Sequence, residues 1–282
     1  MKLKKRSRSQ LLRSLIQAAF VLFVLISAVL HNISEDLAPS TDAYCPFGGV
    51  ETLWRWATTG YFVSKTHGSN LALALGLLIS VLLVGGTFCG WLCPFGALQD
   101  ALNWVRGKLK LPTLRVPDRV DRILIYGRYV VLVGILGATI GTAKLWFADF
   151  DPYRTIFSLG WLFEFNLAEQ WPAYLTALLI LAGALFIPRF WCRYMCPLGG
   201  LISLVQRVSL FRIRRDMKTC INCGQCTKAC PVRLPVAKSV DVTSRCIGCL
   251  KCAEACPKVG ALDVTFILPP AERPQVQPDP KG

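Results

Sequence analysis

Charged residues are scarce in this chain: they make up 17% of its 282 residues, whereas hydrophobic residues make up 53%. This composition excludes most soluble proteins and is typical of a membrane protein. Among the charged residues, acidic ones are fewer than basic ones. There are 17 aspartates and glutamates against 32 lysines and arginines, which gives a net charge of +15. The sequence also has no phosphate-binding loop, no nucleophile paired with a base and no recognisable DNA-binding or signalling domain. These absences argue against an autonomous enzyme and against a signalling regulator.

Long apolar stretches are present instead, and four of them are long enough to cross about 30 Å of hydrocarbon. They cover residues 14–30, 71–88, 123–143 and 172–187. The first follows a basic cytoplasmic leader (residues 1–13), but its apolar run is longer than that of a usual signal peptide. The sequence therefore predicts a mainly α membrane protein with four transmembrane helices and a membrane domain at residues 14–215.

The basic residues alternate with the spans. The leader has six basic and no acidic residues, residues 91–122 have six and three, and the chain after the fourth span has fifteen and six. The loops 31–70 and 144–171 each have two basic and four acidic residues. Because lysine and arginine collect on the cytoplasmic side, we predict a multi-pass protein of the inner (plasma) membrane with both termini in the cytoplasm. This reading makes lipid the partner of the basic residues and excludes nucleic acid.

Two cysteine runs follow the fourth span. They read Cys220-x2-Cys223-x2-Cys226-x3-Cys230-Pro231 and Cys246-x2-Cys249-x2-Cys252-x3-Cys256-Pro257. This spacing is typical of the ligands of two [4Fe–4S] clusters, in which the fourth ligand comes from the other run. We therefore expect one cluster on Cys220, Cys223, Cys226 and Cys256, and the other on Cys246, Cys249, Cys252 and Cys230. Two four-thiolate zinc sites are the alternative, but these use pairs of C-x2-C separated by a longer spacer.

These runs predict a bacterial-type 2[4Fe–4S] ferredoxin domain of the α+β class at residues 216–268. The tail after it, residues 269–282, is rich in proline and charge and is expected to be disordered. Cluster ligands need reduced thiolates, which fits a cytoplasmic position of this domain.

The membrane part is predicted to be a two-fold internal repeat, with one copy at 14–110 and the other at 122–215. The landmarks are Cys89-x3-Cys93-Pro94 and Cys192-x3-Cys196-Pro197 after spans two and four, and Cys45-Pro46 and Asp151-Pro152 in the outer loops. The offset between copies is 103 residues at the cysteine pairs and 106 at the outer loops. Because both copies have the same polarity, we expect an axis along the membrane normal.

The five cysteines outside the runs are candidates for an additional redox centre: Cys45, Cys89, Cys93, Cys192 and Cys196. One hypothesis is a joint site of the four paired thiols, either a third iron–sulfur centre or a site beside a quinone. The alternative is plain packing, because cysteine is small and common between membrane helices. Cys45 would meet Asp151 across the axis, as a pair suited to proton-coupled redox chemistry, or would only form a turn with the residues after it.

A basic amphipathic stretch follows each cysteine pair, at Ala97–Lys110 and Gly200–Arg215. We predict interfacial helices there, which hold the ferredoxin domain against anionic lipid. The same basic residues could dock an acidic soluble donor, in which case raising the ionic strength should slow electron transfer.

In combination, the four spans, the two C-x3-C-P-x-G signatures and the C-terminal two-cluster domain resemble the NapH/NosR-type membrane ferredoxins. The resemblance covers the chain from the first span to about Val264. It implies an electron-transfer subunit of an oxidoreductase complex, which relays electrons between a quinol or membrane redox partner and a reductase system. It also implies a flavin- or haem-containing partner subunit, and a flavin would lie on that partner because this chain has no room for the flavin-binding domain of NosR-type proteins.

Two other functions remain open. An accessory or assembly factor of a respiratory metalloenzyme would resemble the CcoG-type cytochrome oxidase accessory proteins, which have a similar layout and serve metal maturation. A redox-sensing membrane regulator is the third reading. Genomic neighbourhood discriminates the first two: reductase or flavoprotein genes favour the relay, and oxidase or copper-transport genes favour maturation.

Overall fold

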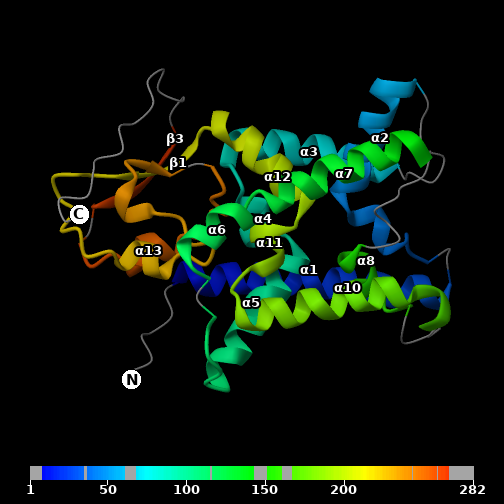
Figure 1. The fold of residues 1–282 in the computed structure, drawn as a ribbon, viewed down its shortest axis with the longest axis horizontal. Helices are drawn as coiled ribbons and strands as arrows, with labels where there is room; N and C mark the ends of the chain where they lie inside the picture. The colour runs from blue at the N-terminus through cyan, green and yellow to red at the C-terminus, as the bar shows by residue number, and fades with distance from the viewer. Residues whose placement is uncertain are drawn as a thin grey trace. The chain divides into compact units, whose positions relative to one another are not determined.

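The computed structural model describes residues 8–34, 37–60, 68–114, 116–142, 151–160, 167–242, 244–258 and 260–266. The tail predicted to be disordered and the first seven residues of the leader lie outside these ranges. The described chain is mainly helical and has one small sheet, as the sequence predicts (Figure 1).

The chain divides into two compact units. Unit 1 combines Met1–Gln17, Ile79–Cys93 and Leu201–Gly282, and unit 2 combines Ala18–Leu78 and Pro94–Gly200. This division differs from the sequence-based boundary between residues 215 and 216. The physical reason is that the segment with the cysteine runs packs with the first turns of the N-terminal helix and with a short stretch near residue 90.

Unit 2 is built from helices that bury one face against one another. The elements up to its end are α1 (Arg8–Ile33, whose first turns belong to unit 1), η1 (Thr41–Tyr44), α2 (Pro46–Thr59), α3 (Gly68–Val84), α5 (Pro94–Lys108), α6 (Asp118–Leu124), α7 (Gly127–Thr142), α8 (Pro152–Phe157), α10 (Leu167–Phe186) and α11 (Phe190–Tyr194). Helix α10 packs against α5, α8 and α11, and α7 packs against α2 and α11 (Figure 1). Phe95 lies at the centre of this core, with its ring 6.0 Å from that of Trp191 and 6.5 Å from that of Phe157.

Helices cover most of the described residues of each predicted span, but the second span ends in α4 (Thr87–Trp91) and the third begins in α6. Two helical segments of the described residues are long and apolar enough to cross a membrane, Arg8–Ile33 and Asp118–Gly141. The second of these is α6 and α7 together. The helices at spans two and four have shorter apolar segments, Ser69–Val84 and Gln170–Phe186.

Large apolar side chains point away from the protein on these helices. Examples are Leu22 on α1, Leu75 on α3, Val133 on α7 and Leu178 on α10, each more than half exposed. Exposed leucine and valine in this number are unfavourable in water and favourable in lipid.

Unit 1 contains the only strands of the described residues. Its elements are α4 (Thr87–Trp91), the end of α12 (Pro197–Val205), η3 (Gln206–Val208), β1 (Phe211–Arg215), α13 (Gln225–Ala229), η4 (Val236–Lys238), β2 (Asp241–Val242), α14 (Lys251–Ala255) and β3 (Leu262–Phe266). Strand β1 lies between β2 and β3 and is antiparallel to both. Ile213, at the middle of β1, pairs with Val242 on one side and Val264 on the other.

The prediction of a basic interfacial helix at the end of Gly200–Arg215 is wrong. The helix ends early, and residues 211–215 form strand β1. The sequence Phe-Arg-Ile-Arg-Arg is compatible with the period of a strand, and pairing with β2 and β3 holds it in that conformation. Arg212 and Arg215 are buried rather than presented to lipid, and Arg212 forms an ion pair with Asp241.

Candidate metal centres

The two cysteine runs surround two separate cavities in unit 1. Cavity one is lined by Cys220, Cys223, Cys226 and Cys256, and cavity two by Cys230, Cys246, Cys249 and Cys252. Each cavity thus takes three cysteines from one run and the last cysteine from the other. The unoccupied space is similar in size, about 350 and 310 Å³ including the part open to solvent.

The runs form this arrangement because both have the same backbone path. In each, the residue directly before the second cysteine has a positive φ, 53° at Asn222 and 58° at Gly248. A second residue with positive φ follows the second cysteine, Gly224 in one run and Leu250 in the other. These left-handed turns wrap the chain around the cavity before a five-residue helix, α13 or α14, which ends directly before the fourth cysteine. The two short helices then pack together, which brings each fourth cysteine to the other cavity.

Burial raises the pKa of two thiols of cavity two and so favours their protonated form. It raises the pKa of Cys252 to about 12 and raises the pKa of Cys246 further. Burial also raises the pKa of Cys226 in cavity one. Thiolates at these positions therefore need a positively charged ligand, and binding of iron would release protons.

Four thiols around one cavity fit a [4Fe–4S] cluster, which is held by four cysteine thiolates. Such a cluster is larger than a single ion and spreads its ligands. Within the described ranges, no three His, Cys, Asp or Glu side chains lie together in a way that could hold one metal ion.

Two charged side chains line cavity one, Arg215 and Lys258, and Arg215 is the buried one. It is 5% exposed, and its guanidinium donates to the side-chain oxygen of Asn222 at 3.2 Å and approaches the Cys220 Sγ at 3.9 Å. A buried guanidinium beside a ligand sulfur stabilises negative charge there and tunes the reduction potential of a bound cluster. In the sequence, Arg215 is recognisable only as the last residue of a basic stretch.

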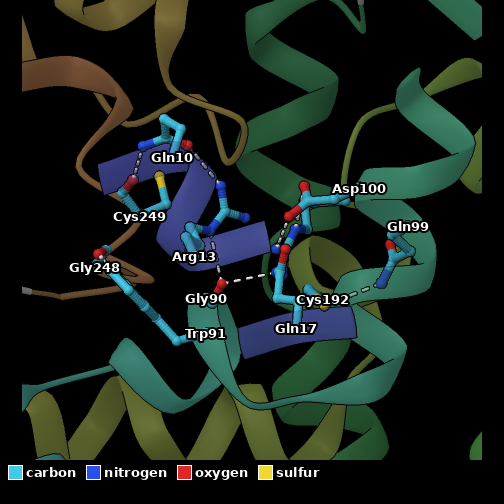
Figure 2. Close-up of polar contacts among 11 residues, drawn as sticks. Gln10, Arg13, Gln17, Gly90, Trp91, Gln99, Asp100, Cys192, Gly248 and Cys249 are labelled. Atoms are coloured by element: carbon cyan, nitrogen blue, oxygen red, sulfur yellow. Dashed lines mark hydrogen bonds and ion pairs between the residues drawn. The ribbon is translucent and has the colours of Figure 1, made fainter. Parts of the chain in front are cut away.

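The loop that carries three cysteines of cavity two is held by chain segments that lie far away in the sequence (Figure 2). Gln10 donates to the Cys249 carbonyl oxygen at 2.8 Å, and Trp91 donates its indole N–H to the Gly248 carbonyl oxygen at 2.9 Å. Gln206 donates to the Cys246 carbonyl oxygen at 2.8 Å. Three side chains from α1, α4 and η3 therefore hold the loop that carries three ligands.

The same network holds the first C-x3-C segment. Arg13 and Gln17 of α1 both donate to the Gly90 carbonyl oxygen, at 2.8 and 2.9 Å (Figure 2). Cys89 packs against the apolar core that contains the buried cysteines of cavity two. The first C-x3-C segment and cavity two are thus neighbours within unit 1.

The two C-x3-C segments have the same local structure. Each first cysteine lies in a five-residue helix, α4 or α11, and each second cysteine follows it directly before a proline that begins the next helix. The N–H groups of Cys93 and Cys196 donate to the carbonyl oxygens of Phe88 and Trp191, both at 2.9 Å. A proline directly after the second cysteine suits either a break or the first turn of a helix, and here it takes the first position of the following helix.

The second segment has its own polar surroundings in unit 2. Gln99, which is 1% exposed, donates to the Cys192 Sγ at 3.1 Å and accepts from the Trp191 N–H. Arg189 pairs with Asp100 through two contacts of 3.1 and 2.5 Å. Because Cys89 and Cys93 belong to unit 1 and Cys192 and Cys196 to unit 2, a joint site of the four thiols stays a prediction.

Cys45 and Asp151 occupy equivalent positions in unit 2. Each precedes a helix that begins with proline, α2 or α8, and the Asp151 carboxylate accepts from the Tyr153 N–H at 2.9 Å. Burial, followed by the charges of Asp42 and Glu51, raises the pKa of Asp151 to about 7. Burial and the negative charge of Asp151 raise the pKa of Cys45. The two groups therefore interact electrostatically, and their redox role stays a prediction.

Several supporting residues were not found from the sequence. Gln10, Trp91, Gln99 and Gln206 are ordinary polar or aromatic residues in their segments, and only the fold gives them their partners. Trp91 stands near the end of a predicted span, where an aromatic residue is ordinary, and nothing in the sequence points to its bond to Gly248.

Comparisons with known proteins agree with the chemistry of the cavities. The family described as "4Fe-4S binding domain" matches twice, at residues 66–112 and 170–218, and the family described as "4Fe-4S dicluster domain" matches residues 212–257. YccM of Escherichia coli is 30% identical over 71% of this chain, NirI of Paracoccus denitrificans 37% over 57%, and the ferredoxin-type protein NapH of Haemophilus influenzae 29% over 57%.

The matched part spans only a portion of these relatives: 56% of YccM, 23% of NirI and 53% of NapH. No solved structure matches the chain.

Proposed function

We propose, from the premise that this chain is a member of the NapH/NosR-type family of 4Fe-4S ferredoxin proteins, that it relays electrons through two [4Fe–4S] clusters in unit 1. One cluster would be held by Cys220, Cys223, Cys226 and Cys256, and the other by Cys230, Cys246, Cys249 and Cys252. A bound cluster supplies one-electron storage. The observation that carries the proposal is the grouping of these eight cysteines, four around each of two cavities.

The protein's own groups would set how easily each cluster accepts an electron. Burial of the cysteines in cavity two disfavours added negative charge, and Arg215 beside cavity one favours it. The two cavities are therefore expected to differ in reduction potential. Proximity of the runs, through the packing of α13 on α14, provides the path for an electron between them.

A membrane anchor is part of the proposal. Four helices with exposed apolar side chains would span the inner membrane as two copies of one unit, with both termini in the cytoplasm. The equal local structure of α4 and α11, and the double match of one 4Fe-4S family, support the repeat. A quinol or a membrane redox partner would then exchange electrons with the clusters, and a flavin- or haem-containing reductase subunit would be the other partner. The chain would act as an electron-transfer subunit and not as an autonomous enzyme.

Counting iron and acid-labile sulfide in the full chain, purified without oxygen, tests this function. About eight irons with the matching EPR signals are expected for two clusters, and about twelve would add a centre on the four paired thiols. Protein without iron and labile sulfide would overturn the proposal. A reporter fused to the C-terminus tests the orientation, since activity of the fusion outside the membrane contradicts a cytoplasmic head.

Two matched pairs of substitutions test which cysteines bind the same cluster. Cys256→Ser should remove the same EPR signal as Cys220→Ser, although Cys256 belongs to the other run. Cys230→Ser should remove the same signal as Cys246→Ser. If Cys256→Ser instead removes the signal that Cys246→Ser removes, each cluster takes its four ligands from one run and the pairing is wrong.

A further inference from the structure

We propose that the exposed rim of cavity one is the docking surface for an acidic soluble redox protein, whereas cavity two exchanges electrons with the C-x3-C segment α4. This inference rests on the proposed electron relay and adds its order: segment α4, cavity two, cavity one, soluble partner. Four observations within unit 1 carry it. They are the burial of the cysteines, the contacts between segment α4 and the loop of cavity two, the positive charge of the rim of cavity one, and the apolar side chains at its centre.

The two cavities differ in how far their cysteines are buried. Cys246, Cys249 and Cys252 of cavity two are only 6–7% exposed. In cavity one, Cys223 is exposed, Cys220 and Cys256 are half-buried, and only Cys226 is buried. Electron transfer between proteins needs a close approach to the cofactor, and the side of Cys223 is the one that a soluble partner can reach.

Segment α4 of the same unit contacts the loop of cavity two. The backbone of α4 touches its loop so closely that a Cβ atom on Gly86 would lie 2.3 Å from the Cys246 carbonyl oxygen. Trp91 and Gln10 fasten the same loop through its carbonyl oxygens. Three of the four cysteines of cavity two are buried and Cys230 is half-buried, and the thiol of Cys89 packs against the core that contains them.

The rim of cavity one is positively charged. Three exposed lysines each lie two residues from a cysteine of this cavity: Lys218 before Cys220, Lys228 after Cys226 and Lys258 after Cys256. Lys258 itself lines the cavity. The exposed carboxylate beside them, Asp216, accepts from the Lys218 N–H at 3.0 Å and from the Thr219 hydroxyl at 2.5 Å. The surplus of positive charge selects a partner with a negative surface.

The centre of the rim is apolar. Ile221, 56% exposed, lines cavity one together with Cys223, and Met217, 37% exposed, contacts the Arg215 guanidinium, which lines the same cavity. An apolar centre with a charged border is the arrangement of a transient protein interface, in which charge speeds the encounter and a small apolar patch excludes water. Binding of lipid headgroups would need only the lysines and not the apolar centre. For this reason we assign the rim to a protein partner.

The redox step at this surface is a one-electron transfer. The partner loses one electron and is oxidised, the [4Fe–4S] group held by cavity one gains it and is reduced, and no covalent bond forms or breaks. The electron then passes to cavity two and to segment α4, or follows the same path in reverse when the partner is oxidised.

Charge reversal at the rim tests the inference in the full chain, reconstituted in nanodiscs without oxygen. The variant is K218E/K228E/K258E, and the probe is a reduced, acidic plant-type ferredoxin. At low salt we expect the probe's affinity, measured by surface plasmon resonance, and its rate of oxidation to fall about ten-fold or more, because steering by three charges is lost and reversed. Raising the salt should slow wild type and leave the variant nearly unchanged.

The matched control is K108E/K110E/R119E, which makes the same change in net charge at exposed positions of unit 2. Lys108 and Lys110 belong to the basic stretch Ala97–Lys110, the other docking site for an acidic donor that the sequence offers, so this variant also tests that alternative. This control should bind the probe as wild type does, and reduction by the small carrier methyl viologen should remain fast in both variants. Equal loss in both variants would mean that net charge alone matters and would overturn the inference. A defect that appears only in nanodiscs with phosphatidylglycerol would assign the rim to lipid and would also overturn it.

The iron and sulfide content of each sample separates the two proposals. If wild type contains no clusters, the electron relay itself fails. If wild type and variant both contain two clusters and bind the probe equally, only the docking surface and the order of transfer are wrong.

Discussion

Gly90 and Ile247 approach each other so closely that no side chain fits between them. A Cβ atom on Gly90 would lie 2.0 Å from the Ile247 carbonyl oxygen, far inside any normal contact. The atom it would meet belongs to the backbone, which has little freedom to move aside. Helix α4 and the loop of cavity two are therefore held at a separation that only glycine allows.

The substitution Gly90→Ala should displace the loop of cavity two. We expect loss of the cluster held by Cys230, Cys246, Cys249 and Cys252, with about half of the iron and one EPR signal retained by cavity one. The control is Gly107→Ala in α5, where an added Cβ meets nothing within 4 Å. Full iron content in Gly90→Ala would show that α4 and the loop adapt easily.

The substitution Cys89→Ser tests whether the first C-x3-C segment passes electrons to cavity two. Since Cys89 packs against the core of that cavity, quinol should reduce the clusters several-fold more slowly while both EPR signals persist. Cys192→Ser is the matched change in the second copy. If Cys89→Ser leaves the rate unchanged, the thiol only fills space.

The buried ion pair of Arg189 and Asp100 fixes α11 against α5. Arg189 is 1% exposed, so Asp100→Ala leaves its charge without a counter-ion in the interior. Breaking a buried pair in this way should lower the free energy of unfolding by about 3–5 kcal/mol. Denaturant unfolding in mild detergent measures it. Arg214→Ala, at a pair of which Arg214 is 57% exposed, is the control and should cost less than about 1 kcal/mol.

Asp151 makes the stability of unit 2 depend on pH. Burial, Asp42 and Glu51 raise its pKa to about 7, and Arg154 opposes this only in part. Because the folded state then binds its proton more tightly than the unfolded state, stability is full at acid pH and is lost as pH rises from about 4 towards 7. Between pH 5.5 and 8, Asp151→Asn should therefore lose less thermal stability than wild type, while the amide still caps α8. Parallel pH profiles of the melting temperature would contradict this.

The cysteine spacing was the most informative part of the sequence. It led to the same two groups of four cysteines that line the cavities, because the repeated run prescribes one backbone path twice. The proline after each C-x3-C pair was compatible with a break or with the first turn of a helix, and the structure has it at the start of α5 and α12. Local patterns of this kind specify local structure without knowledge of the rest of the chain.

Long-range contacts were out of reach of the sequence. Arg13 was counted as one of six charges that orient the first span, yet it is 3% exposed and donates to Gly90. The stretch ending at Arg215 was read as a basic interfacial helix, because its charge suggested lipid. Pairing with β2 and β3, from residues later in the chain, decides that it is a strand.

The discontinuous make-up of unit 1 has a consequence for its biosynthesis and for its use as a part. The ribosome synthesises the turns that carry Gln10 and Trp91 long before it reaches the cysteine runs. These two side chains can therefore bind the loop of cavity two only after the runs have been synthesised. Residues 216–268 are for the same reason no self-contained cassette. Fused to a different membrane anchor, this fragment would lack Gln10 and Trp91 and the hydrogen bonds that they donate to the loop of cavity two. The cofactor bound there would then be more accessible to oxygen.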